Sequence, residues 1–190
     1  MMLEAFDPTS SKPVQPFVAA LDLSPEALER VRGALNVRRY VEQLAHEGCA
    51  ADALAVIARG LPVQYLVAWC CECVRTSLDS AGAQLEAERA AVALAEQCLR
   101  QPTEDNRQLC LEFAERARHA TAGAWLATAV GWAEGSLAPP GSPRVPAPDE
   151  AVAAAVLAAL KLTATRYAGV ARETRLKTFA DRALTVFGSA

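Results

Sequence analysis

Three of the chain's six cysteines stand close together, at Cys70, Cys71 and Cys73. A C-x-x-C pair of this kind can bind zinc or carry out thiol exchange, because thiolates are both metal ligands and nucleophiles. A structural zinc site needs four ligands, however, and no second pair follows in the sequence. The cluster also lies inside an apolar helical pattern, without the strand-to-helix setting of thioredoxin-like motifs. We therefore expect these three thiols to pack in a core, where free cysteine behaves as a small hydrophobic residue.

The two histidines are the remaining candidates for acid–base catalysis. His46 opens the sequence His46-Glu47-Gly48-Cys49, which lies at a predicted helix end with Gly48 as the stop, and histidine there commonly stabilises the terminal carbonyls. Neither His46 nor His119 accompanies a G-x-S-x-G nucleophile motif, and neither of the glycine-rich phosphate loops occurs in the chain. We expect no catalytic residue, no metal and no cofactor, and we predict that the protein is not an enzyme.

Charge and hydropathy restrict the partners. The formal net charge of −3 and the pI near 5.5 give no general attraction to nucleic acid or to anionic membranes. The longest apolar run, Ala151 to Leu160, is roughly half of the ~20 residues that a membrane span needs. Residues 1–23 lack the pattern of a secretory signal, so the thiols are expected to stay reduced. We expect a cytoplasmic protein that binds another protein, with no nucleic acid and no membrane as partner.

The composition favours helices. Hydrophobic residues make up 52% of the chain but aromatic residues only 6%, since alanine supplies much of the apolar fraction. Alanine is the best helix former and has little preference for strands. We predict an all-α fold of about eight helices without a sheet, as an orthogonal helical bundle or a short stack of α-hairpins. Ser24-Pro25-Glu26 has the pattern of a helix N-terminus, so the ordered part is expected to begin there. We therefore predict a flexible segment over 1–23 and a single helical domain over 24–190.

Three segments carry more specific predictions. Val63 to Val74 is almost entirely apolar, which predicts a central and mostly buried helix. Gln84 to Arg100 is amphipathic, with Glu88 among the polar residues assigned to its solvent face. Thr103 is expected to cap the next helix, and the apolar pattern of that helix predicts a buried face with Leu109, Cys110 and Phe113.

Five prolines lie between residues 135 and 148 and interrupt the helical pattern. Proline cannot continue a helix, so this segment is predicted to be one long, extended connection. Trp69 is expected in the core, whereas Trp132 stands one turn before the connection, where it could form part of an exposed groove. The predicted partner-binding residues are therefore Trp132, Leu137, Pro139 and Pro140.

The segment from Ala124 to Pro140 has the pattern A-W-x-A-x-A-x-x-W-x-x-G-S-L-A-P-P, and an alanine-rich helix follows it from Ala151. Together with Ala68-Trp69-x-Cys71-x-Cys73, this pattern resembles an uncharacterised family of alanine-rich helical bacterial proteins, over residues 60–187. The resemblance implies an association with type VI-like secretion genes. It brings no catalytic residues, and its motif is interpreted as structural.

The sequence as a whole favours a non-enzymatic protein–protein interaction module, such as an adaptor, a chaperone or an accessory protein of a bacterial type VI secretion system. One alternative is an immunity-type or regulatory protein that binds and blocks one partner, because the same acidic helical surface suits that role. The alternative from another class is a thiol or zinc protein that uses Cys70, Cys71 and Cys73.

Overall fold

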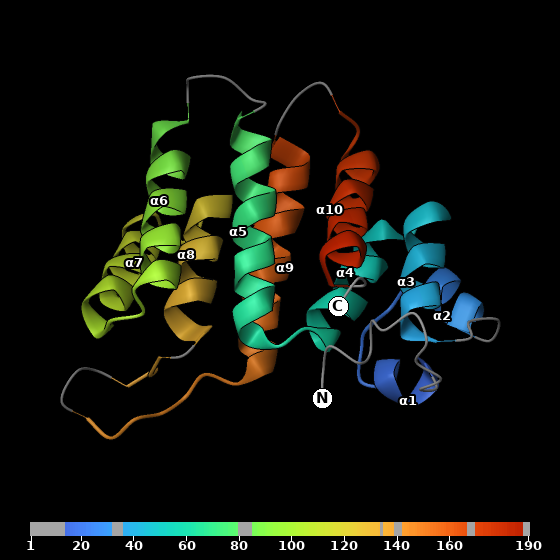
Figure 1. Cartoon of the computed structure of the whole chain (residues 1–190), viewed down its shortest axis with the longest axis horizontal. Coiled ribbons are helices and arrows are strands. Elements are labelled where there is room, and N and C mark those ends of the chain that lie inside the picture. The colour runs from blue at the N-terminus through green and yellow to red at the C-terminus, as the bar shows by residue number, and fades with distance from the viewer. Residues whose placement is uncertain are drawn as a thin grey trace. The chain divides into compact units, whose positions relative to one another are not determined.

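The structure is a computed structural model that describes residues 14–31, 36–79, 85–133, 135–138, 142–166 and 170–187. These residues form the helices α1 to α10, and none of them lies in a strand (Figure 1). The all-α prediction is therefore confirmed. The helices group into two compact units, Met1–Pro62 with Gly169–Ala190, and Val63–Ala168. The predicted flexible segment over 1–23 and the single domain over 24–190 stay predictions, because two compact units can belong to one domain.

The first unit joins the beginning of the chain to its end. It contains the helices α1 (Val14–Val18), α2 (Pro25–Val31), α3 (Val37–His46), α4 (Ala50–Gly60) and α10 (Arg172–Phe187). Helix α3 packs against α4, and α10 contacts both of them. The ring of Tyr40 is fully buried among these helices, and its hydroxyl donates to the carbonyl of Ala27 at 2.7 Å. A buried phenol with a satisfied hydroxyl fixes α2 against α3.

The predicted helix ends of this unit are present. The Ser24 hydroxyl accepts a hydrogen bond from the amide of Ala27 at 3.2 Å, as an N-cap does. Gly48 has a φ of +83°, a left-handed conformation that glycine adopts without strain, and this residue ends α3 as predicted. The N-cap residue of the next helix, α4, makes no side-chain cap bond. The first amide of α4, at Ala50, donates instead to the carboxylate of Glu173 on α10 at 2.7 Å.

The second unit is a bundle of five consecutive helices. They are α5 (Val63–Asp79), α6 (Glu86–Arg100), α7 (Glu104–Arg116), α8 (Ala122–Ala133) and α9 (Asp149–Arg166). The predicted burial of α5 is confirmed, with Trp69 in the core and a narrow exposed stripe. Helix α8 nevertheless lies at the centre, since it contacts each of the other four (Figure 1). Its small residues explain this position: a Cβ on Gly123 would come within 2.6 Å of the Cβ of Ala91 on α6.

Two predictions about buried faces were wrong. Glu88 on α6 is 4% exposed, although the amphipathic pattern placed it toward solvent. On α7, Thr103 does cap the helix, but the buried residues are Asn106, Arg107, Cys110 and Ala114, while Leu109 is exposed and Phe113 half-buried. On α6 the predicted face is buried and extends to Glu88, whereas on α7 the buried face is shifted toward Arg107. Each of these two charged side chains is buried because it finds polar partners inside the bundle.

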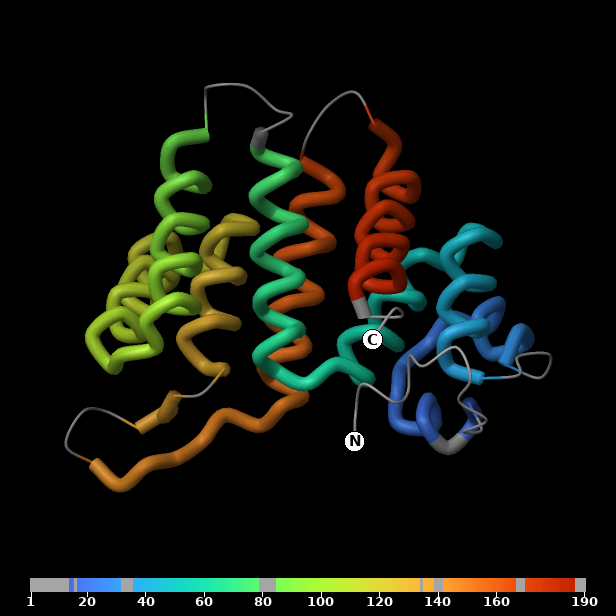
Figure 2. The backbone as a smooth tube through the Cα atoms, in the orientation of Figure 1, coloured from blue at the N-terminus to red at the C-terminus, as the bar shows by residue number. Residues whose placement is uncertain are grey.

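The connection between α8 and α9 has no helix in its described residues, as its prolines predict. Figure 2 shows residues 142–148 as an extended course that leads into α9. The beginning of this connection, at residues 135–138, lies beside the candidate functional site.

Candidate functional site

A pocket of about 430 Å³ opens within the second unit, between α5, α6, the start of α7 and the end of α8. Its wall is mostly apolar, and several lining residues are exposed, so that it is open to solvent. The lining residues are Gln64, Tyr65, Val67, Ala68, Cys98, Leu99, Pro102, Thr103, Glu104, Arg107, Val130 and Ala133. A concave apolar site with a few convergent polar groups is the usual form of a binding pocket.

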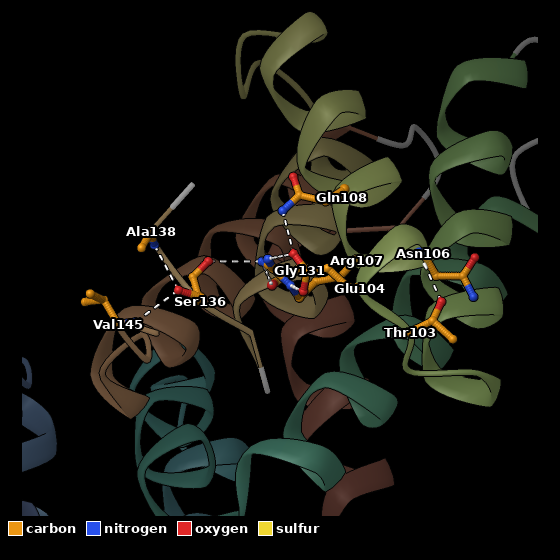
Figure 3. A network of polar contacts seen from close by, with 9 residues as sticks. All are labelled: Thr103, Glu104, Asn106, Arg107, Gln108, Gly131, Ser136, Ala138 and Val145. Carbon is orange, nitrogen blue, oxygen red and sulfur yellow. Dashed lines mark hydrogen bonds and ion pairs between the residues drawn. The ribbon is translucent and has the colours of Figure 1, made fainter. Parts of the chain in front are cut away.

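Arg107 is the buried charge of this pocket, with 6% of the residue exposed. Its guanidinium donates through Nη1 to the carbonyls of Gly131 and Ser136, at 3.1 Å each (Figure 3). The same guanidinium forms a two-point ion pair with Glu104, in which Nε donates to Oε2 at 2.7 Å and Nη2 donates to Oε1. Arg107 thus joins the start of α7 to the end of α8 and to the connection that follows.

Gly135 allows this approach. A Cβ at that position would overlap Cδ of Arg107 and would come within 2.6 Å of its Nε. A side chain larger than hydrogen would therefore displace the guanidinium from the carbonyl of Ser136.

Glu104 occupies the exposed edge of the pocket, and 56% of its side chain is accessible. Hydrogen bonds from Arg107 and then from Gln108 lower the pKa of Glu104 from 4.5 to about 2. The carboxylate is therefore ionised at every pH at which the protein is expected to work. Its folded-state pKa is depressed, so it stabilises the fold above about pH 4.5 and loses that contribution as the pH falls toward 2.

This pKa leads to a testable pH dependence. We expect Glu104→Gln to lower the free energy of unfolding by about 1 kcal/mol at pH 7, a value discounted for the exposure of the carboxylate. The difference from wild type should shrink as the pH falls below about 4.5, because the Glu104 carboxyl of the unfolded chain then takes up a proton, which favours unfolding of the wild type. Urea unfolding between pH 3 and 7 measures it, with Glu112→Gln on the same helix as the control. An equal difference at both ends of this range would contradict the assignment.

The connection is fixed at its start by hydrogen bonds from its main-chain amides. The Ser136 hydroxyl accepts hydrogen bonds from the amides of Ala138 and Val145, both at 3.0 Å (Figure 3). The amide of Leu137 donates to the carbonyl of Val145 at 2.7 Å. Leu137 and Val145 are 47% and 49% exposed, so this turn presents a pair of apolar residues to solvent.

The predicted partner-binding residues are thus described in part. Leu137 is exposed, Trp132 is half-buried at the end of α8, and the amide of Gly135 donates to the carbonyl of Trp132 at 3.3 Å. Pro139 and Pro140 lie outside the described residues. Whether these residues bind a partner stays a prediction.

A family model matches residues 40–187, and it is described as a Family of unknown function (DUF6931). The chain belongs to this family. The match runs from within α3 to the end of α10, so it contains the pocket, Arg107 and the whole connection, whereas α1 and α2 precede it. The expected membership in an uncharacterised family is confirmed. No curated protein and no solved structure matches the chain.

The clustered cysteines of this DUF6931 member are buried on α5. Burial raises the pKa of the Cys70 thiol well above 9.0 and that of the Cys71 thiol to about 12. The Cys70 thiol donates to the carbonyl of Val156 on α9 at 3.9 Å. Among the residues that the structure describes, no three His, Cys, Asp or Glu side chains are grouped so that they could hold a metal ion. These environments favour packing as the role of the cluster.

Neither histidine of the family member lines the pocket. His46 is exposed in the last turn of α3. His119 has a left-handed φ of +52° after the end of α7, and its ring lies 5.1 Å from that of Trp125.

No helix in the described part of the chain is both long and apolar enough to cross a membrane.

Sequence reasoning missed the pocket and its arginine. The only signal was the spacing of Glu104 and Arg107, which places an acid and a base one turn apart on a helix. Such pairs are common on exposed faces, and nothing in the sequence shows that the carbonyls of Gly131 and Ser136 converge on this guanidinium.

Proposed function

We propose that this chain is a protein–protein interaction module, and that its pocket receives an apolar side chain of a partner segment that carries a neighbouring Lys or Arg. The observation that supports this proposal is the pocket itself, which combines a wall of apolar side chains with one ionised carboxylate at its exposed edge.

The apolar wall suits a leucine-sized or aromatic anchor. Val67 and Val130 form buried parts of it, while Tyr65, which is 45% exposed, stands at its rim. A volume of about 430 Å³ exceeds that of a single large side chain, so an anchor can enter together with part of its backbone. Burial of aromatic or aliphatic anchors in such pockets dominates the energy of many protein interfaces.

The charge at the pocket edge supports a basic neighbour. Arg107 is buried behind Glu104, so the group that faces solvent is the carboxylate. Asp105 follows on the same helix and is exposed. A Lys or Arg of a partner would meet negative charge here, which favours correct orientation and disfavours acidic competitors.

The proposal is tested by selecting peptides from a random displayed library on the wild-type protein and on two variants. Ala68→Trp places a large side chain in the pocket, whereas Ala154→Trp puts the same side chain on an exposed position of α9 outside the pocket. We expect wild type and Ala154→Trp to enrich peptides with an apolar anchor beside Lys or Arg, and Ala68→Trp to lose at least about tenfold in affinity for them. Enriched peptides that bind Ala68→Trp as tightly as wild type would contradict the proposal, as would a selection that enriches no peptide.

The finer assignment, an adaptor, chaperone or accessory protein of a bacterial type VI secretion system, is part of the same proposal and rests on the sequence resemblance alone. A pocket that recognises a short apolar and basic segment supports that role, because docking of a short segment through apolar anchors is a recurring mode of peptide recognition.

A further inference from the structure

The second half of the connection between α8 and α9 has a backbone that is restricted at almost every residue. Residues 142–148 have the sequence S-P-R-V-P-A-P, so each of them except Arg144 is a proline or precedes one. A proline holds its own φ near about −65°, and the residue before a proline is driven from the helical region toward extended conformations. These restraints favour a polyproline II helix, and Figure 2 shows the segment as an extended course.

The exposure of this segment follows the period of that helix. A polyproline II helix has three residues per turn, so residues three positions apart share an edge. Pro143 and Pro146 form one edge and are both exposed. Val145 and Pro148 form a second edge and are also exposed, whereas Ala147 on the third edge is half-buried. The segment therefore turns two of its three edges, with all three proline rings, toward solvent.

Hydrogen bonds to neighbouring segments hold the extended course in place. The amide of Val145 donates to the hydroxyl of Ser136 at 3.0 Å (Figure 3), and the carbonyl of Val145 accepts from the amide of Leu137 at 2.7 Å. At the end of the segment, the carbonyl of Pro148 accepts from the amide of Ala151 in the first turn of α9 at 2.9 Å. A partner that binds a segment already fixed in this way loses little free energy to ordering it.

We propose that residues 142–148 are a ligand for a second protein, whose groove is lined by aromatic side chains and receives the rings of Pro143 and Pro146. These two prolines have the P-x-x-P spacing, and segments with this spacing dock in aromatic-lined grooves because the polyproline helix is already formed. This surface goes beyond the proposed pocket, since here the chain supplies the segment and the partner supplies the groove.

The chemistry of the segment disfavours the other common way of binding an extended chain, which is to add it as a strand to the edge of a sheet. Strand addition depends on main-chain hydrogen bonds, and proline has no amide hydrogen to donate. Three of the seven residues are prolines, and the amide of Val145 already donates to Ser136. Ring faces and carbonyl oxygens remain as the groups that a partner can recognise, and an aromatic groove uses these groups.

The test titrates the full-length chain against an array of purified SH3, WW and EVH1 domains, whose grooves bind proline-rich segments. We expect saturable binding to at least one domain, and displacement of the chain by a proline-rich peptide ligand of that domain, because both occupy the same groove. Replacement of both Pro143 and Pro146 by alanine should weaken this binding at least about tenfold. The absence of binding to all three classes would overturn the proposal, as would a double variant that binds as tightly as wild type.

Matched variants show that the loss is local. Pro25→Ala removes an exposed proline at the first position of α2, outside any extended segment, and should bind the domain as wild type does. The double variant should unfold at the same urea concentration as wild type, because both rings are exposed. Ala68→Trp fills the pocket and should leave the affinity for the domain unchanged, so a failure of this proposal is distinguishable from a failure of the proposed docking in the pocket. A domain that binds the double variant but not Ala68→Trp would contradict the assignment to the connection.

Discussion

Replacement of Glu88 by alanine is expected to lower the free energy of unfolding by about 3 kcal/mol. Glu88 is 4% exposed on α6, and its Oε2 accepts the amide of Gly123 at the start of α8 at 2.5 Å. Its Oε1 accepts from Nη1 of Arg166, in the last turn of α9, at 2.8 Å. One carboxylate therefore joins three helices of the second unit. Loss of the carboxylate leaves the buried amide of Gly123 unpaired and removes the ion pair with Arg166. The Arg166 side chain is 44% exposed, so solvent weakens this ion pair and it contributes the smaller part of the expected loss.

Urea unfolding at neutral pH measures this effect through the transition midpoint at constant slope. Glu86→Ala, which removes an exposed glutamate from the first turn of the same helix, is the control and should change the free energy by less than about 0.5 kcal/mol. Glu88→Gln should fall between the two, because an amide oxygen still accepts from Gly123 but carries no charge for Arg166. If Glu88→Ala unfolds at the same urea concentration as Glu86→Ala, the carboxylate does not stabilise the bundle as described.

Much of the fold follows from local chemistry, and those parts were predicted. Ser24 and Thr103 cap helices because their side-chain oxygens accept backbone amides, and Gly48 ends a helix because it adopts a positive φ. The prolines of residues 142–148 exclude a helix, and the apolar run around Trp69 is buried. Each of these outcomes depends on residues a few positions apart in the chain. Sequence patterns predict structure over that range.

The candidate site depends on contacts between distant segments, and this is why the sequence did not reveal it. Glu88 and Arg107 are charged residues on amphipathic helices, and hydropathy assigns such residues to solvent. Both are buried because partners from other helices meet them: Gly123 and Arg166 in one case, Gly131 and Ser136 in the other.

Replacement of Arg107 by methionine is the second large effect that we expect, again about 3 kcal/mol of lost stability. Methionine fills the space of the aliphatic stem but donates no hydrogen bond, so the carbonyls of Gly131 and Ser136 lose their donor and Glu104 loses its ion-pair partner. Arg116→Met, at an exposed position in the last turn of the same helix, is the control and should stay within about 0.5 kcal/mol of wild type.

The same substitution should have a local effect on the connection that global destabilisation alone would not produce. Without Arg107, Ser136 is held less firmly, and its hydroxyl is the acceptor for the amide of Val145. Limited trypsin digestion under native conditions should therefore cut after Arg144 faster in Arg107→Met than in Glu88→Ala, although both variants lose similar stability. Equal cleavage rates in the two variants would mean that Arg107 stabilises the bundle without fixing the connection. Faster cleavage in Arg107→Met would show that one guanidinium couples the pocket to the exposed pair Leu137 and Val145, because its carbonyl acceptors belong to the end of α8 and to that turn.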